Sequence, residues 1–198
     1  MTETTIFKIM FVIACYLIGS VCFGYVFAKA LKRKDFGKED LPGAAGTYRQ
    51  LGHKIGIATG FLDMAKGLIP ILLAKYVIKL DIYTIAIAGL AIVVGHNWPI
   101  FFRFKGGGGL STTIGVSLAL VPLEFSIAFP VAVASGFIYK YTLRERFKVS
   151  PNPIGGGIGV FLLPILAFIF HEPLPIVILF ICVFIIIVVK GIILYKTN

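Results

Sequence analysis

The chain has 198 residues, of which 58% are hydrophobic and 14% are charged. Soluble domains average about 45–50% apolar and about 25% charged residues, so this composition excludes an ordinary water-soluble fold. Nineteen Lys and Arg residues against nine Asp and Glu residues give a net charge of +10. A positive charge suits nucleic acid, anionic lipid or an anionic substrate, and the positions of the basic residues must distinguish these partners.

Seven apolar runs follow one another along the chain. They cover residues 10–31, 55–74, 82–102, 110–123, 125–139, 154–170 and 174–194. Most approach the ~20 residues that cross a bilayer, and the first run lacks the marks of a cleaved signal peptide. The run 110–123 is the shortest, since a helix of this length rises only about 21 Å. We therefore predict an all-α polytopic membrane protein with about seven transmembrane helices in a single transmembrane domain, residues 1–198.

The distribution of basic residues predicts the orientation. Seven spans put Lys8, Lys75 and Lys79 on one side and leave Lys66 inside a span, so that the other 15 basic residues lie on the opposite side. Cytoplasmic loops carry the excess of Lys and Arg. The N-terminus is therefore predicted outside and the C-terminus in the cytoplasm of a multi-pass cell-membrane protein. The excess of positive charge is therefore explained by the orientation in the membrane and by contact with cytoplasmic lipid. We expect no nucleic-acid partner.

Two glycine-containing segments lie on the predicted cytoplasmic side. The long connection 32–54 contains Gly43 and Gly46, with Arg49 close behind. The second segment, Lys105 to Gly109, directly precedes Ser111 and Thr112. Glycines allow backbone N–H groups to approach a ligand, and the start of a helix favours phosphate. These patterns suit a phosphate site or, equally, tight turns between spans.

Ionisable residues inside the spans must face protein or water. Asp63 and Lys66 share a helix face, which predicts an intramembrane ion pair, and Asn97 is a second polar residue with a structural role. His96 lies near the predicted cytoplasmic interface. The sequence has no GxSxG motif and no cluster with zinc-ligand spacing, so we predict neither a metal nor a cofactor. Any chemistry must rest on positioning and charge stabilisation, which suits an already activated acyl donor.

A resemblance follows from four segments. Residues 95–112 are similar to the GHxWPxFxxFKGGKGVAT signature of the bacterial membrane glycerol-3-phosphate acyltransferases of the PlsY family. Gly19, Ser20 and Gly24 resemble the family's GSxxxG motif. Residues 63–70 resemble its DxxKGxxP motif, and residues 42–49 resemble its PGATNxxR motif.

The resemblance implies transfer of an acyl chain from acyl phosphate to the sn-1 hydroxyl of glycerol 3-phosphate, which makes lysophosphatidate for phospholipid biosynthesis. Membrane lipids would surround this enzyme. Arg49, His96 and Lys105 are the implied catalytic residues, with His96 as a candidate proton acceptor. The implied phosphate-binding residues are Gly43, Gly46, Arg49, Lys105, Gly106, Gly107, Gly108, Gly109, Ser111 and Thr112.

The chain departs from the family pattern at several positions. Glu39 aligns with the family's serine, Gly46 with the asparagine of PGATN and Gly108 with the second lysine of KGGKG. The His and Asn of the family's C-terminal HxxNI are absent from residues 188–192. Glu39 and Asp40 would repel an anion if they lay at the site. These departures leave a catalytically silent, lipid-binding or regulatory relative as the alternative. A small transporter that uses Asp63, Lys66 and His96 as a relay ranks third.

Overall fold

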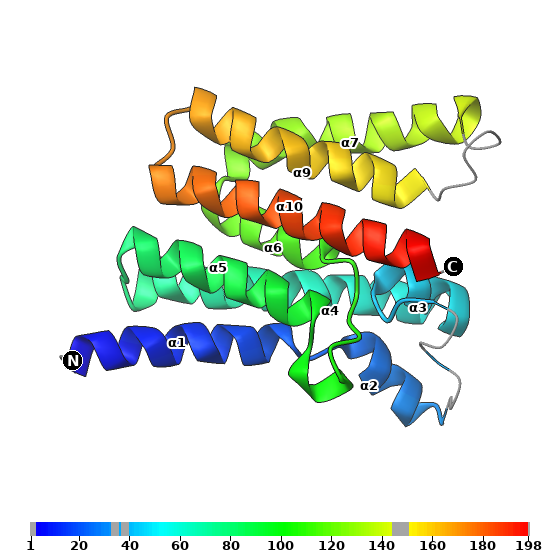
Figure 1. Cartoon of the computed structure of the whole chain (residues 1–198), viewed down its shortest axis with the longest axis horizontal. Helices are drawn as coiled ribbons and strands as arrows, with labels where there is room; N and C mark the ends of the chain where they lie inside the picture. The colour runs from blue at the N-terminus through cyan, green and yellow to red at the C-terminus, as the bar shows by residue number, and fades with distance from the viewer. Residues whose placement is uncertain (1–2, 33–35, 37–39, 144–150, 198) are drawn as a thin grey trace. The chain divides into compact units, whose positions relative to one another are not determined.

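The computed structural model describes residues 3–32, 36, 40–143 and 151–197, and the element labels follow Figure 1. Every element in this part of the chain is a helix. The chain divides into two compact units, Met1–Ala119 and Leu120–Asn198. The sequence prediction of a single transmembrane domain stays a prediction, and each unit is described by itself.

The first unit holds the elements up to α6. They are α1 (Glu3–Gly19), α2 (Phe23–Ala30), α3 (Ala44–Leu51), α4 (His53–Leu72), the π-turn η1 (Leu73–Val77), α5 (Ile82–Asn97), the 3₁₀ turn η2 (Ile100–Phe102) and α6 (Leu110–Leu120), whose last residue passes the unit boundary. Figure 1 shows α1 lying along α5, and α3 packs against α4. The sequence predicted no helix in the connection 32–54, where the structure has α3.

Small residues allow the backbones of α1 and α5 to touch. A β-carbon on Gly19 would overlap the carbonyl oxygen of Ile92, and one on Gly95 would overlap the carbonyl oxygen of Tyr16. The Tyr16 hydroxyl also donates a hydrogen bond to the Trp98 carbonyl oxygen at 3.0 Å. Close approach of this kind is typical of helix packing in membranes, where small residues replace the bulky side chains of a water-soluble core.

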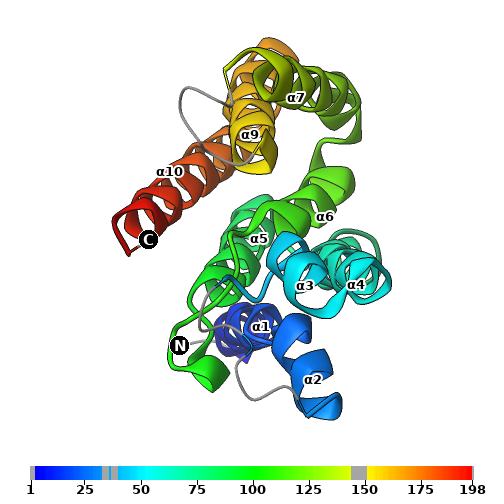
Figure 2. The same ribbon diagram turned by 90° about the vertical axis from the view of Figure 1, so that its right-hand side faces the viewer.

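The second unit is built from three long helices, α7 (Pro122–Thr142), α9 (Pro151–Ile169) and α10 (Leu174–Thr197). The helix α9 packs against both α7 and α10, and Figure 2 shows α7 and α9 side by side. Gly155 allows the close approach of α9 to α7, because a β-carbon there would overlap the Ala132 carbonyl oxygen. The residues 188–192 lie in α10.

Within the described residues, four helical stretches are long and apolar enough to cross a membrane: His53–Val77, Ile82–Phe102, Pro122–Thr142 and Leu174–Ile193. A fifth arises if α1 and α2 count as one span, although they meet at a bend of 46°. The sequence predicted a membrane span over 10–31, and the structure divides this run between α1 and α2. The predicted weak run is α6, whose 11 residues rise only about 16 Å.

Candidate functional site

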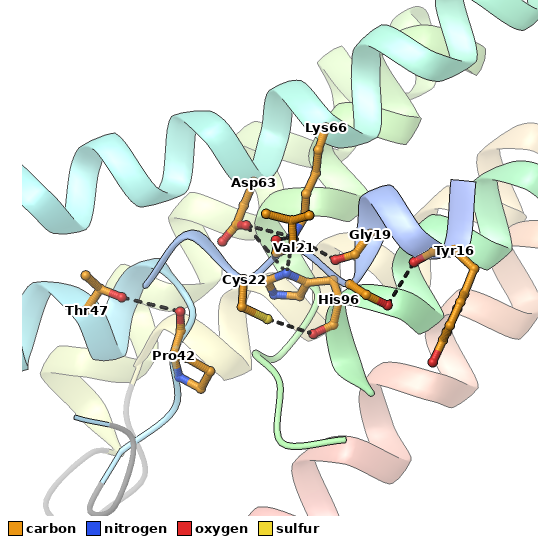
Figure 3. Close-up of polar contacts among 10 residues, drawn as sticks. Tyr16, Gly19, Val21, Cys22, Pro42, Thr47, Asp63, Lys66 and His96 are labelled. Carbon is orange, nitrogen blue, oxygen red and sulfur yellow. Dashed lines mark hydrogen bonds and ion pairs between the residues drawn. The ribbon is translucent and has the colours of Figure 1, made fainter. Parts of the chain in front are cut away.

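The break between α1 and α2 supplies two carbonyl groups to the interior of the first unit. The Nζ atom of Lys66, on α4, lies 2.9 Å from the Gly19 carbonyl oxygen and 2.6 Å from that of Val21. The last carbonyls of a helix have no partner within the helix, and a lysine can satisfy them. Lys66 therefore fixes the break in the first apolar run, as Figure 3 shows.

Lys66 is also the centre of a buried ionic cluster. Its Nζ atom lies 2.9 Å from the Asp63 Oδ1 atom, which is the ion pair that the spacing of three predicted. The same Nζ atom lies 2.9 Å from the Nδ1 atom of His96, at the end of α5. The Asp63 Oδ1 atom is 3.6 Å from that ring nitrogen. Since all three side chains are buried, α1, α4 and α5 are joined by one polar cluster of Asp63, Lys66 and His96.

The Gly106–Gly109 segment wraps around the His96 end of α5. The Gly107 N–H donates to the His96 carbonyl oxygen at 3.1 Å. A β-carbon on Gly107 would overlap the His96 Nε2 atom and would lie 3.2 Å from the Gly43 α-carbon. The two glycine segments predicted separately from the sequence thus meet at one edge of the His96 ring.

Two helices begin beside this meeting point. Gly43 is the N-cap of α3, without a side-chain cap, and Gly109, with φ of +84°, precedes α6. The side chains of Ala44 and Ser111, at the two helix starts, lie 3.1 and 3.9 Å from where a β-carbon of Gly60 would be. The first N–H groups of a helix lack partners within the helix and attract anions. Two helix N-termini therefore converge at the glycine segments.

Arg49, a predicted phosphate ligand, is engaged by a carboxylate. Its Nε atom lies 2.6 Å from the Asp40 Oδ2 atom, and its Nη2 atom lies 2.9 Å from Oδ1. These hydrogen bonds hold the pKa of the Arg49 guanidinium above its ordinary value. The Arg49 side chain is 51% exposed, so the pair is accessible to solvent. The sequence predicted that Asp40 would repel an anion at the site, and in the structure the Asp40 carboxylate pairs with the guanidinium that was predicted to bind phosphate. Glu39, the other predicted acid, lies outside the described residues.

The remaining predicted ligands differ in their surroundings. Lys105 is exposed, Ser111 is half-buried, and a β-carbon on Gly108 would meet only the Leu41 Cδ1 atom, at 4.0 Å, among the described residues. The others pack against neighbouring backbone or side chains: Gly46 against Leu41, Gly106 against the carbonyls of His96 and Asn97, Gly109 against Asn97, and Thr112 against Gly67. Asn97, for which the sequence predicted a structural role, is fully buried.

Two parts of this site were missing from the sequence prediction. The contact between Lys66 and His96 joins residues 30 positions apart, and no local spacing indicates it. The carbonyls of Gly19 and Val21 become available only because the first apolar run breaks. The Gly19–Ser20 pair was the available signal for that break, since glycine and serine pairs are common where helices kink.

The comparisons with known proteins agree with one another. A family model described as Glycerol-3-phosphate acyltransferase matches residues 9–196. The chain is 40% identical over 163 residues to a glycerol-3-phosphate acyltransferase of Shouchella clausii (strain KSM-K16), which is 80% of this chain and 76% of the relative. It is 35% identical over 187 residues to a protein of the same name from Aquifex aeolicus (strain VF5), covering 93% of this chain and 88% of the relative.

Solved structures show the same likeness. A crystal structure of PlsY, an integral membrane glycerol 3-phosphate acyltransferase, in its glycerol 3-phosphate form has a TM-score of 0.82 and 30% sequence identity, covering 96% of this chain and 90% of that chain. The lysophosphatidic acid form has a TM-score of 0.78 and 32% identity, covering 92% of this chain and 87% of that chain. Since the family model spans almost all of the sequence, the chain belongs to the glycerol-3-phosphate acyltransferase family.

Proposed function

We propose that this chain is a multi-pass membrane acyltransferase that moves an acyl chain from acyl phosphate to the sn-1 hydroxyl of glycerol 3-phosphate. The products are lysophosphatidate and inorganic phosphate. The observation that carries the proposal is the convergence of two glycine segments and two helix N-termini at His96. Both proposed substrates carry a phosphate, and backbone N–H groups at a helix start favour such an anion.

Some of the residues around His96 would bind substrate phosphate, and others would hold those residues in place. In this proposal, the N–H groups of Gly106 to Gly109 and of the start of α3 surround phosphate oxygens. Lys105 and Arg49 add positive charge, and Ser111 and Thr112 stand at the start of α6. Arg49 must exchange Asp40 for phosphate, which its solvent exposure permits. Asp63, Lys66 and Asn97 are buried, and in this proposal they support His96 and the glycine segment without contacting substrate.

No protein nucleophile is required for this reaction. The sn-1 hydroxyl oxygen bonds to the carbonyl carbon of acyl phosphate, and the bond from that carbon to the phosphate oxygen breaks. The hydroxyl proton passes to the departing phosphate. His96 is the catalytic side chain placed beside the reacting atoms, and the site contributes orientation and stabilisation of negative charge.

Turnover by the purified protein tests this function. The protein in a membrane mimic is mixed with acyl phosphate and glycerol 3-phosphate, and lysophosphatidate and phosphate are measured. A charge-assisted hydrogen bond is worth about 1.5–3 kcal/mol, so we expect Arg49→Ala to lower kcat/KM by about 10- to 150-fold. Arg103→Ala, which removes another exposed arginine, is the matched control. Absence of product with the unsubstituted protein would favour a catalytically silent relative.

The seven-span arrangement in the cell membrane, with the N-terminus outside and the site on the cytoplasmic face, is part of the proposal. It is supported by the segregation of basic residues, since cytoplasmic loops carry the excess. Lys79→Cys and Lys105→Cys provide a test with a thiol reagent that cannot cross the membrane. We expect labelling of position 79 from outside intact cells and labelling of position 105 only after the cells are opened. Labelling of both from outside would overturn the orientation.

A further inference from the structure

A pair of opposite charges joins α1 to α5 near the ends at which both helices begin. The Lys8 Nζ atom lies 2.7 Å from the Asp81 Oδ2 atom. Asp81 is the N-cap of α5 and directly precedes the apolar stretch Ile82–Phe102, which could cross a membrane. The two helices run side by side in the same direction, since Gly19 of α1 meets Ile92 of α5 further along (Figure 1). The charge pair therefore lies at the membrane surface where the two spans begin.

An apolar groove between α1 and α5 adjoins this charge pair and has a volume of about 300 Å³. A water molecule takes up about 30 Å³ in the liquid, and a methylene group is of similar size, so the groove has room for about ten methylene groups. Its isoleucines are each about half exposed, so the groove is open to the surrounding lipid. The lining comes from both helices and includes Lys8, Ile9, Val12 and Ile13 of α1 and Thr84 and Ile87 of α5.

Both members of the charge pair have unused hydrogen-bonding capacity. A lysine ammonium has three donors, and within the described part of the chain Lys8 uses one of them, for Asp81. A carboxylate has about four acceptor positions. The Asp81 carboxylate accepts from Lys8 and from the Thr84 hydroxyl at Oδ2, and from the Thr84 N–H group at Oδ1. Since the two side chains are 37% and 38% exposed, Lys8 can donate to another anion while Asp81 accepts from another cation.

We propose that the groove and the Lys8–Asp81 pair bind one zwitterionic phospholipid with a primary ammonium group, which is phosphatidylethanolamine. The lipid phosphate accepts from Lys8, the ammonium donates to Asp81, and one acyl chain lies in the groove. This headgroup balances both charges of the pair. An anionic phospholipid would place negative charge beside Asp81 with no cation to balance it, and a choline headgroup has no N–H group to donate.

This lipid site lies at the opposite end of α5 from the proposed phosphate site. Asp81 and His96 are 15 positions apart, or about 22 Å along the helix. The bound lipid is therefore neither a substrate nor a product at the glycine segments. Its binding does not depend on the proposed acyl transfer.

Native mass spectrometry of the purified full chain in detergent tests the headgroup. The protein is freed of lipid and then receives phosphatidylethanolamine, phosphatidylglycerol or phosphatidylcholine with the same acyl chains. We expect one phosphatidylethanolamine for each chain, bound up to about fivefold more tightly than the other two, because its ammonium adds one exposed charge pair. Equal or tighter binding of either other lipid would overturn the proposal, as would a second copy of the chain that excludes the lipid. This comparison needs no substituted protein.

Two charge variants test the role of Asp81. Asp81→Asn removes the partner of the lipid ammonium but keeps a good N-cap residue at the start of α5. We expect it to reverse the preference toward phosphatidylglycerol, because Lys8 becomes an unbalanced cation. Glu3→Gln is the matched control, since it removes an exposed acid from the first turn of α1 outside the groove. It should keep the preference for phosphatidylethanolamine. A preference that is unchanged in Asp81→Asn would refute the assigned headgroup contact.

Two larger side chains test the groove. Ile87→Trp places a bulky ring where the acyl chain would lie, and each methylene group in an apolar site contributes about fourfold to affinity. Displacement of two such groups should weaken binding of phosphatidylethanolamine about 15-fold. Ile57→Trp, at an exposed position of α4 outside the groove, is the matched control and should bind the lipid normally. Equal affinity of the two variants, at equal thermal stability, would exclude the groove as the acyl-chain site.

Discussion

Alanine at Gly107 is the sharpest single perturbation of the site. Its β-carbon would overlap the His96 Nε2 atom and would lie 2.9 Å from the Cε1 atom. The ring has little freedom to move away, because its Nδ1 atom is held by Lys66 at 2.9 Å and the side chain is buried. The substitution must therefore shift either the loop or the imidazole.

The loss of activity expected for Gly107→Ala has two causes, which are the extra atoms in a packed interior and the displacement of the His96 ring. Extra atoms in a well-packed interior cost about 1–3 kcal/mol. A displacement of about 1 Å in a catalytic group can lower the rate about 10²-fold. We expect Gly107→Ala to lose about 10²-fold in kcat/KM while the protein still folds, because one methyl group in one loop is the whole change.

Gly108→Ala is the matched comparison in the same loop. Its β-carbon would lie 4.0 Å from the Leu41 Cδ1 atom and meets no closer atom among the described residues. The backbone N–H is kept, and a substitution that disturbs no packing usually stays within about 0.5 kcal/mol, or about twofold. The assay is lysophosphatidate formation at matched thermal stability. If Gly107→Ala were as active as Gly108→Ala, the placement of the glycine loop against His96 would be refuted.

Three further predictions concern other parts of the first unit. Asp40→Asn removes the carboxylate that pairs with Arg49 and so leaves the guanidinium available to phosphate. An exposed ion pair is worth about 0.2–1 kcal/mol, so the KM for glycerol 3-phosphate should fall by up to about fivefold. An unchanged or higher KM would contradict this prediction. Asp81 pairs with Lys8 and caps α5, and both contacts lower the pKa of its carboxyl group. Asparagine keeps the cap but loses the exposed ion pair, so Asp81→Asn should cost about 0.2–1 kcal/mol of stability at neutral pH. This difference should shrink as the pH falls below about 4, where the unfolded chain binds the proton, and thermal unfolding at several pH values measures it. Gly95→Ala should lower the melting temperature strongly, because its β-carbon would overlap backbone of α1, and unchanged melting would refute that close contact.

The residues of the site could be predicted in part because short motifs carry them. Asp63 and Lys66 are three positions apart on one helix, and their ion pair follows from that spacing. The glycines of 106–109 and Gly43 also stand out in the sequence, since each glycine segment lies next to a basic residue. These local patterns do not show which segments come together in the folded chain. That Gly43 and Gly107 lie against each other at the Nε2 edge of the His96 ring depends on how α3, α5 and α6 pack.

The fold shows the same division between local and non-local information. The apolar runs 55–74 and 82–102 correspond to helical stretches that could cross a membrane, because continuous hydrophobicity is a local property. The break in the run 10–31 could not be found by counting apolar residues. It is stabilised by Lys66 from another helix, which satisfies the Gly19 and Val21 carbonyls. Similarly, the partner of Arg49 is Asp40, and the sequence indicated only that the acid would disfavour an anion.

The contacts of Gly108 and Gly46 show whether a larger family residue would fit at these two positions. Gly108 stands where the family has its second lysine, and a β-carbon there would meet only the Leu41 Cδ1 atom, at 4.0 Å, among the described residues. Gly46 stands where the family has asparagine, and a β-carbon there would overlap the Leu41 carbonyl oxygen. A β-carbon therefore fits at position 108, whereas position 46 requires glycine in the present backbone. Gly108→Lys is accordingly the substitution that restores a family residue with the least disturbance.

The central claim is that acyl phosphate donates its acyl chain to glycerol 3-phosphate at this site. The most direct measurement gives the purified protein glycerol 3-phosphate with acyl phosphate or with acyl-coenzyme A of the same chain length, and quantifies lysophosphatidate and phosphate. We predict one phosphate released for each lysophosphatidate formed from acyl phosphate, and no product from the coenzyme A ester. Product from acyl-coenzyme A alone, or from neither donor, would contradict the account.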